Sequence, residues 1–346
     1  MPSILFGVSP VGLGHATRAL VLSRELERRG AAVTLFSGGY AAEFMEGSGA
    51  PVDDIVDDSG PRVVDGEMKR ASTWYLMSWW AHRGNLARAE RLFDSHPHDL
   101  VVCDEEFSGI VAAERRGEPR VFISDELELG FARSWLARRL ERRVEGWYRR
   151  LQSSVDVLIV PEEGEDSGNR RFVGPIVRPM TMTCPEVRRR HGIPEGRMVL
   201  FSMSGYGVGR ELAARLASSL RSAAGPELTL VISGNRGDRI KGEGVYDLGV
   251  VMDNQNLVAC ADAVVSTAGK STIDEASAAG TPIITIPIRH HAEQERNAAA
   301  LGYSAEDTGR LAELVRSKVG RREQPRGYSG EKKAADAIFS VLGARG

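Results

Sequence analysis

The sequence predicts an α/β protein built from two doubly wound domains, each a parallel sheet covered by helices on both faces. Short runs rich in Val, Ile and Leu alternate with stretches of helical length along most of the chain. The alternation occurs twice, on either side of a Gly- and Pro-containing segment at 172–180 that is typical of a hinge. The length of 346 residues is also about twice the ~150 residues of an average domain.

The first half begins with an apolar strand at 3–8, followed by a glycine-rich turn. A helix at 15–29 comes next, because Leu20, Leu22 and Leu26 form an apolar stripe and Gly30 is a natural stop. The further strands that we expect are 32–36, 100–103, 120–123 and 155–160, and the further helices are 72–93 and 131–153.

The second half repeats this order of elements. We expect strands at 198–203, 228–233, 245–248, 263–265 and 283–286, and helices at 210–223, 271–279 and 293–301. The domains are therefore placed at 1–178 and 179–329, and the pattern does not assign the last helix, in 330–346, to either. Two doubly wound sheets in tandem predict a cleft between the carboxyl ends of their strands, where such sheets bind ligands.

Composition excludes several classes of protein. Lys and Arg number 45 against 47 Asp and Glu, so no global charge attracts nucleic acid or an anionic membrane. Cys103, Cys184 and Cys260 are far apart and match no metal-ligand spacing, so we expect neither a disulfide framework nor a zinc site. With no signal-type start and no run near the ~18 apolar residues of a membrane span, the sequence favours a cytoplasmic protein.

Glycine is abundant, at 38 residues, and gathers in three corners between an expected strand and an expected helix. These corners are 12–15, 204–209 and 268–272. The free N–H groups and positive dipole of a helix start hold anions, and absent Cβ atoms let a phosphate or sugar approach the backbone. Ordinary turn chemistry is the alternative at each corner.

Two familiar nucleotide motifs do not fit these corners. A P-loop ending at Gly269-Lys270 would put its first glycine on Val264, inside a strand. The dinucleotide fingerprint meets Thr17 or Arg210 where it needs a third glycine.

The first and third corners resemble those of a known family. Gly12-Leu-Gly14-His15-Ala-Thr-Arg18 resembles the G-x-G-H loop of glycosyltransferases with the GT-B fold. The stretch 261–298, which contains Ser266-Thr-Ala-Gly269-Lys-Ser-Thr-Ile-Asp-Glu275 and Glu293-Gln294, resembles the donor signature of MurG-type and UDP-glucuronosyltransferase-like enzymes. This resemblance implies a GT-B architecture, with an acceptor-binding N-terminal domain and a donor-binding C-terminal domain.

The resemblance also implies a donor site made mostly of main chain. Glu275 matches the acidic residue that holds the donor ribose, Gln294 matches a glutamine on the donor sugar, and a segment around Val251 and Met252 matches the base-binding main chain. Lys270 replaces a small residue and either contacts phosphate or faces solvent. The implied set is Gly12, Gly14, Ser204, Gly205, Gly207, Val251, Met252, Gly269, Lys270, Ser271, Thr272, Glu275 and Gln294. Since backbone donors take the place of a cation, we expect no metal and no cofactor besides the nucleotide sugar.

For chemistry, transfer needs a base to take the proton of an acceptor hydroxyl. His15 is the expected base because imidazole titrates near neutral pH, and Asp104 at a strand end matches the residue that orients it. Glu105 and Glu106 compete with Asp104 for that role, and His15 can alternatively serve only in binding. His290 and His291 are adjacent, so their side chains diverge and do not indicate a metal.

The acceptor side is expected in the first half. Residues 131–153 carry seven Arg against two Glu along an apolar helical stripe, which fits either a helix packed on its sheet or one lying on an anionic bilayer. The residues proposed for an acceptor groove or membrane contact are Trp74, Trp79, Trp80, Arg138 and Arg142.

The resemblance thus implies a metal-independent, inverting transferase that moves a hexose or N-acetylhexosamine from a UDP-sugar, or another nucleotide-diphosphate sugar, to a hydroxyl acceptor. A lipid-linked acceptor would bring it to the inner face of the cell membrane. The alternatives are a non-hydrolysing sugar-nucleotide epimerase and a non-catalytic nucleotide-sugar-binding protein. No nucleic-acid partner is expected.

Overall fold

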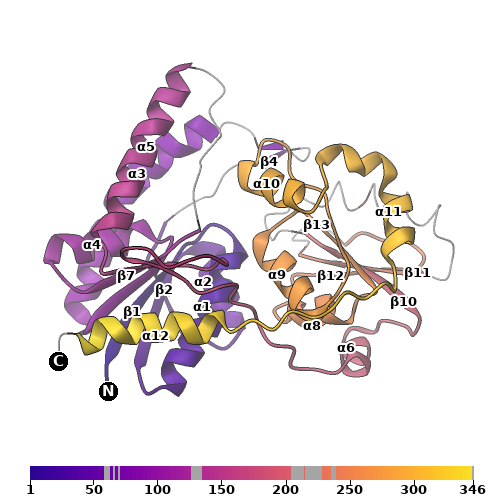
Figure 1. Ribbon diagram of the computed structural model, residues 1–346, viewed down its shortest axis with the longest axis horizontal. Coiled ribbons are helices and arrows are strands. Elements are labelled where there is room, and N and C mark those ends of the chain that lie inside the picture. The colour runs from indigo at the N-terminus through magenta and orange to yellow at the C-terminus, as the bar shows by residue number, and fades with distance from the viewer. Residues whose placement is uncertain are drawn as a thin grey trace. The chain divides into compact units, whose positions relative to one another are not determined.

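The structure is a computed structural model that describes residues 1–57, 63–64, 67–68, 71–125, 135–203, 214, 228–234 and 239–344. The chain divides into two compact units (Figure 1). The first unit comprises Met1–Pro61, Arg70–Val177 and Tyr328–Gly346, and the second comprises Arg62–Lys69 and Arg178–Gly327. The sequence placed the change from one domain to the next at 178/179 and the start of the last segment at 330.

The first unit is a parallel seven-stranded sheet in the order β3-β2-β1-β6-β7-β8-β9. Its strands are β1 (Ser3–Val8), β2 (Ala32–Ser37), β3 (Val52–Asp54), β6 (Leu100–Asp104), β7 (Arg120–Ile123), β8 (Val157–Val160) and β9 (Arg170–Phe172). Its helices are α1 (Leu13–Arg28), α2 (Gly39–Gly47), α3 (Ala71–Ser95), α4 (Phe107–Arg116), α5 (Trp135–Ser154) and α12 (Gly330–Gly343). The sequence did not predict β3, β9, α2 or α4.

The second unit is a parallel five-stranded sheet in the order β12-β11-β10-β13-β14. The strands are β10 (Arg197–Ser202), β11 (Leu228–Ser233), β12 (Val245–Gly249), β13 (Ala263–Ser266) and β14 (Ile283–Thr285). The helices are α6 (Cys184–His191), α8 (Asn254–Cys260), α9 (Lys270–Ala279), α10 (Ala292–Ala300) and α11 (Leu311–Lys318), with a 3₁₀ helix at Ala305–Arg310. A short antiparallel hairpin of β4 (Val63–Val64) and β5 (Glu67–Met68) groups with this unit. The helix expected at 210–223 lies almost wholly outside the described residues.

Buried central strands explain why the two sheets form. All six residues of β11 are buried, as are all five of β6 and five of the six in β10. Phe36 of β2, Phe122 of β7 and Phe93 of α3 lie in one core cluster of the first unit, together with Ile110 of α4 and Leu151 of α5. Burying an aromatic or large aliphatic side chain contributes roughly 1.5–3 kcal/mol, so these strands require helices on both faces.

The last helix belongs to the first unit. α12 packs against α1 and β8, and Figure 1 shows its yellow ribbon lying against the indigo α1. Arg29 at the end of α1 donates to the Asp336 carboxylate at 2.5 Å and to the Lys332 carbonyl at 3.0 Å. A Cβ on Gly330 would lie 2.4 Å from the Pro175 carbonyl oxygen, so only glycine allows the chain to return to this unit.

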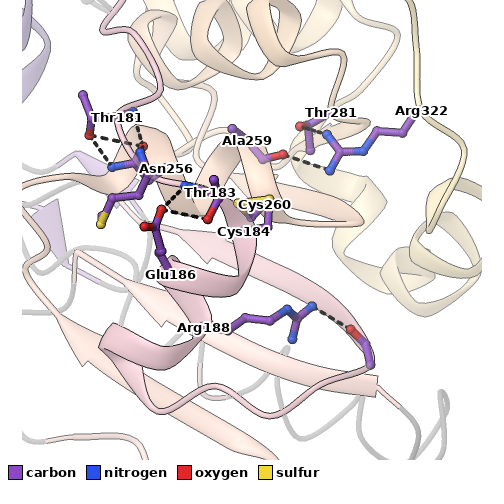
Figure 2. Close-up of a disulfide and its surroundings, with 12 residues drawn as sticks. Thr181, Thr183, Cys184, Glu186, Arg188, Asn256, Ala259, Cys260, Thr281 and Arg322 are labelled. Atoms are coloured by element: carbon purple, nitrogen blue, oxygen red, sulfur yellow. Dashed lines mark hydrogen bonds between the residues drawn. A yellow bond between two sulfur atoms is a disulfide. The ribbon is translucent and has the colours of Figure 1, made fainter.

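One sequence expectation is wrong: Cys184 and Cys260 form a disulfide, with Cα atoms 5.3 Å apart. Figure 2 shows the bond joining the first residue of α6 to the last residue of α8. The cysteines are 76 residues apart in the chain, and only the packing of α6 on α8 brings them within disulfide reach. Cys103 is a buried free thiol in β6.

Candidate active site

His15 and Asp104 meet at the carboxyl edge of the first sheet. The parallel register of β1 and β6 sets Asp104 opposite Val8, and α1 begins five residues after Val8. Gly12 caps α1 with a φ of 89°, a backbone conformation that favours glycine, and the helix then turns His15 back toward β6. The Nδ1 atom of His15 lies 2.8 Å from Oδ1 of the fully buried Asp104.

Arg18, one helical turn beyond His15, binds the same carboxylate. Its Nε atom donates to Asp104 Oδ2 at 2.7 Å and its Nη2 atom to Oδ1 at 2.6 Å, a two-pronged ion pair. A second contact joins Arg18 to Asp125 just after β7, at 3.2 Å. A role for Arg18 was not predicted, although its i+3 spacing from His15 places both residues on one helix face.

These contacts shift the pKa values of the pair in opposite directions. Burial lowers the pKa of His15, but the Asp104 carboxylate outweighs it and the net result is a pKa of about 9. Burial raises the pKa of Asp104, but the Arg18 guanidinium outweighs it and holds this pKa at about 2. Asp104 is therefore a permanent anion at neutral pH, which fixes the imidazole with Nδ1 as the donor.

The two competing carboxylates have different surroundings. Glu106 caps α4 by accepting from the backbone N–H groups of Ser108 and Gly109, at 2.8 and 2.6 Å. Glu105 instead lies beside the imidazole, with Oε2 3.6 Å from Nε2 of His15. Glu106 is thus committed to the helix start, and Glu105 is the second carboxylate at His15.

The second unit holds the predicted donor residues around the start of α9. Gly269 is the N-cap and has no side chain to cap the helix, so the N-cap position leaves the first N–H groups of α9, among them those of Ser271 and Thr272, without a side-chain cap. The preceding residue, Ala268, has a φ of 64°, unusual for a side chain with a Cβ, and its carbonyl accepts from Asn297 at 3.1 Å. Strained backbone held by neighbours is typical of binding sites.

Glu275, one turn into α9, is buried and paired with a residue that the sequence analysis missed. Arg178, the first residue of the second unit after the hinge, donates from Nε to Glu275 Oε1 at 2.8 Å. Its Nη1 atom donates to the Met252 carbonyl at 2.7 Å. Arg178 therefore joins the predicted ribose carboxylate to the predicted base-binding segment, where Val251 packs on the core. The only sequence signal was a basic residue in a hinge.

Lys270 and Gln294 are held by their own unit. Lys270 Nζ pairs with the Asp274 carboxylate at 2.5 and 2.6 Å, one turn along α9. Gln294 is buried, and its Oε1 atom accepts from the Ile288 N–H at 3.0 Å. Their predicted contacts with phosphate and sugar remain predictions.

Several predicted residues lie beyond what the structure describes. Ser204, Gly205 and Gly207 fall outside the described residues. Trp74, Trp79 and Trp80 are in α3, but nothing is described of their side chains. In α5, Arg138 and Arg142 are exposed, whereas Tyr148 and Leu151 are buried in the core. The described part of α5 thus packs its apolar side chains on the sheet.

Neither a membrane-spanning helix nor a metal site is present among the described residues. No described helix is long and apolar enough to cross a membrane. Within the same residues, no group of three or more His, Cys, Asp or Glu side chains is placed to hold a metal ion.

The chain is similar in sequence to known glycosyltransferases. Residues 239–310 match the glycosyltransferase family 28 C-terminal domain. An uncharacterized glycosyltransferase of Methanopyrus kandleri is 28% identical over 60% of this chain, a match that spans 62% of that relative's length. A UDP-N-acetylglucosamine–N-acetylmuramyl-(pentapeptide) pyrophosphoryl-undecaprenol N-acetylglucosamine transferase of Deinococcus deserti is 24% identical, over 87% of this chain and 84% of the relative.

Solved structures show the same fold. The calicheamicin glycosyltransferase CalG4 superposes with a TM-score of 0.62 at 20% identity, covering 99% of this chain and 98% of its own. A UDP-N-acetylglucosamine 2-epimerase gives 0.62 at 12% identity, covering 100% of this chain and 96% of its own, so the fold alone does not separate a transferase from an epimerase. The chain resembles the MurG-like glycosyltransferases of the GT-B fold, and glycosyltransferase is the enzyme class to which its family match and its named relatives point.

Proposed function

We propose that this protein transfers a hexose or N-acetylhexosamine from a nucleotide-diphosphate sugar, with UDP-sugars as the first choice, to an acceptor hydroxyl. The observation that carries the proposal is the buried Asp104 carboxylate on Nδ1 of His15. It leaves Nε2 as the nitrogen that can take a proton. The family 28 match over residues 239–310 supports a donor site in the second unit.

In the proposed reaction, the acceptor oxygen attacks the anomeric carbon as its proton passes to Nε2 of His15. The bond from that carbon to the diphosphate breaks, and the nucleotide diphosphate leaves with the electron pair. Single displacement at the anomeric carbon inverts its configuration. The N–H groups and dipole at the start of α9, with the hydroxyls of Ser271 and Thr272, would hold the leaving diphosphate, so the proposal needs no metal.

The donor ribose is assigned to Glu275. Its Oε1 atom accepts from Arg178, and in this proposal Oε2 accepts the ribose hydroxyl hydrogens. Arg178 would fix both the carboxylate and the main chain at Met252 before the donor arrives, which lowers the cost of ordering the site.

For the acceptor, we propose a lipid-linked hydroxyl compound at the cytoplasmic face of the membrane. The Deinococcus relative, whose name specifies an undecaprenol-linked acceptor, supports this choice. The exposed Arg138 and Arg142 of α5 offer charge for anionic lipid. Equal co-sedimentation of the wild type and the R138S/R142S variant with anionic vesicles would contradict the membrane contact.

The function is tested by measuring thermal unfolding with UDP, GDP, dTDP and their sugars, because a ligand that binds the native state raises the midpoint temperature of unfolding. We expect the largest rise with UDP or a UDP-sugar, and binding about tenfold or more weaker in Glu275→Gln, because a hydrogen bond to a charged group is lost. Glu313→Gln, an exposed substitution on α11, is the matched control.

The products separate the candidate functions. Incubation with a UDP-sugar and water or a model alcohol should release UDP in a transferase and an epimeric UDP-sugar in an epimerase. A binding protein would show the thermal shift with neither product. If no nucleotide or nucleotide sugar changes the midpoint of thermal unfolding of the wild type, then the transferase, epimerase and binding functions are all excluded.

A further inference from the structure

Glu105 occupies the side of His15 that the proposed reaction needs. Asp104 takes Nδ1, and Glu105 Oε2 lies 3.6 Å from Nε2, so the imidazole stands between two carboxylates on neighbouring residues. A lone pair on Nε2 facing an ionised carboxylate would be repelled. The pair is stable only when one proton lies on either Nε2 or Oε2.

The backbone and its neighbours hold Glu105 in this position. Its φ is 47°, in the left-handed region that residues other than Gly, Asn and Asp seldom adopt. The backbone N–H of Glu105 donates to the Ile123 carbonyl at 3.1 Å. Ser124 Oγ donates to Glu105 Oε1 at 3.2 Å, and Tyr148 OH lies 3.4 Å from the same oxygen. A strained residue fixed by several contacts is typical of a functional position.

The charges around the pair come from four elements. Among the described residues, Arg18 of α1, Asp104 of β6, Asp125 after β7 and Tyr148 of α5 interact electrostatically with Glu105. Burial raises the pKa of Glu105 to about 7, and Asp125 and Asp104 add to the rise while His15 and Arg18 oppose it. A carboxyl group that titrates near neutrality can both take up and release a proton under working conditions.

We propose that Glu105 is a positioning residue for His15 that receives the Nε2 proton and thereby converts the resting imidazolium into a base. The proton shifts from Nε2 to Oε2, which leaves a neutral imidazole beside a neutral carboxyl group. The acceptor hydroxyl then gives its proton to Nε2, and the imidazolium stands beside protonated Glu105. One proton returns to solvent from Glu105 after the products leave, which restores the imidazolium beside the ionised carboxylate. This inference deepens the proposed transferase function and rests on it.

If this proposal holds, the pKa of His15 depends on Glu105, and this dependence can be measured without a substrate. We expect Glu105→Gln to lower the pKa of His15 by about one pH unit or more, because an opposite charge within 4–6 Å is removed. The test is an NMR titration of ring-labelled histidines, with the His15 signal assigned by His15→Gln. Glu118→Gln is the matched control, since Glu118 pairs with His98 at 3.1 Å elsewhere in the same unit, and it should leave the His15 titration unchanged.

Two further measurements complete the test. If Glu105→Gln does not fold, Glu105→Asn carries the same titration, because Asn adopts left-handed backbone more readily. In the wild type the acid limb of the rate of UDP-sugar hydrolysis against pH should follow the protonation of Glu105, because the active pair carries one proton. In the variant this limb should follow the His15 titration instead. A His15 titration equal to wild type in a folded variant would overturn the proposal. A wild type that hydrolyses no UDP-sugar, with a shifted titration, would instead count against the transferase function alone.

Discussion

At the scale of single residues, Asp104 has two roles that mutation can separate. It orients His15, and it also neutralises the buried Arg18 through two hydrogen bonds. His15→Ala removes the base and its contacts with Asp104 and Glu105, so we expect loss of at least 10²-fold in UDP-sugar turnover with a smaller loss of stability than in Asp104→Asn. Asp104→Asn removes the buried anion that binds Arg18 through two hydrogen bonds and leaves Arg18 only its contact with Asp125. We therefore expect the same loss of turnover and about 3–5 kcal/mol lower stability.

The measurement compares turnover and urea unfolding for the two variants. Arg28→Ala is a control, because the exposed Arg28 pairs with Glu25, which keeps Arg29 as a partner, and no contact joins Arg28 to His15 or Asp104. Near wild-type turnover in His15→Ala would exclude a base role for this histidine. An Asp104→Asn protein as stable as His15→Ala would show that the Arg18 pair contributes little.

The residue scale also shows what the sequence could predict. The apolar runs predict that β1 and β6 are strands, whereas the role of Asp104 beside His15 was implied by the family resemblance. The adjacency of the two strands, which brings the two residues together, is seen only in the structure. The pairing of Arg178 with Glu275 spans 97 residues and depends on where the hinge crosses the second unit. No local pattern encodes such a contact. The left-handed backbone of Glu105, a residue type that rarely adopts it, was equally invisible.

At the scale of elements, the expected strands agree with the structure to within about two residues because each is a continuous apolar run between polar turns. The helix α4 escaped prediction because its N-cap is Glu106, outside the usual Ser, Thr, Asp and Asn, and because Gly109 interrupts its pattern. Gly109 is required by packing, since a Cβ there would lie 2.5 Å from the Phe36 ring. Tertiary contacts have thus overridden local propensity.

The disulfide yields a prediction at the element scale. The Cys184–Cys260 bond closes a loop of 76 residues and joins α6 to α8. Asn256 of α8 also accepts from the Thr181 backbone at 2.8 Å, just before α6 (Figure 2). Reduction should lower the stability of the second unit by about 2–4 kcal/mol, because the unfolded chain regains freedom.

Urea unfolding followed by circular dichroism, with and without a dithiol reductant, measures this change. The Cys184→Ser/Cys260→Ser variant should match the reduced wild type and show no response to reductant. Equal stability of oxidised and reduced wild type would contradict a stabilising bond.

At the scale of the whole molecule, the two units can be followed separately by their aromatic residues. All five tryptophans occur between residues 74 and 147, which belong to the first unit, and none occurs in the second. Tryptophan fluorescence during unfolding therefore reports on the unit that carries His15, Asp104 and Glu105. This separation matters because a chain of two compact units need not unfold in a single step.

The pKa shifts of the site predict how the stability of the first unit depends on pH. The pKa of Asp104 is lowered to about 2, so its contribution is present above pH ~4 and is lost as the pH falls through 2. The pKa values of Glu105 and His15 are raised to about 7 and about 9. Their contributions are complete below their ordinary values and are lost as the pH rises through 7 and then 9. Stability should therefore be greatest near pH 4–5 and fall by at least about 2 kcal/mol by pH 9.

Urea unfolding monitored by tryptophan fluorescence at each pH measures this fall, and the His15→Gln/Glu105→Gln variant should show a much flatter profile above pH 5. A wild-type profile as flat as that of the variant would mean that the two groups titrate alike in the folded and unfolded chain, and that the site stores no protonation energy for catalysis.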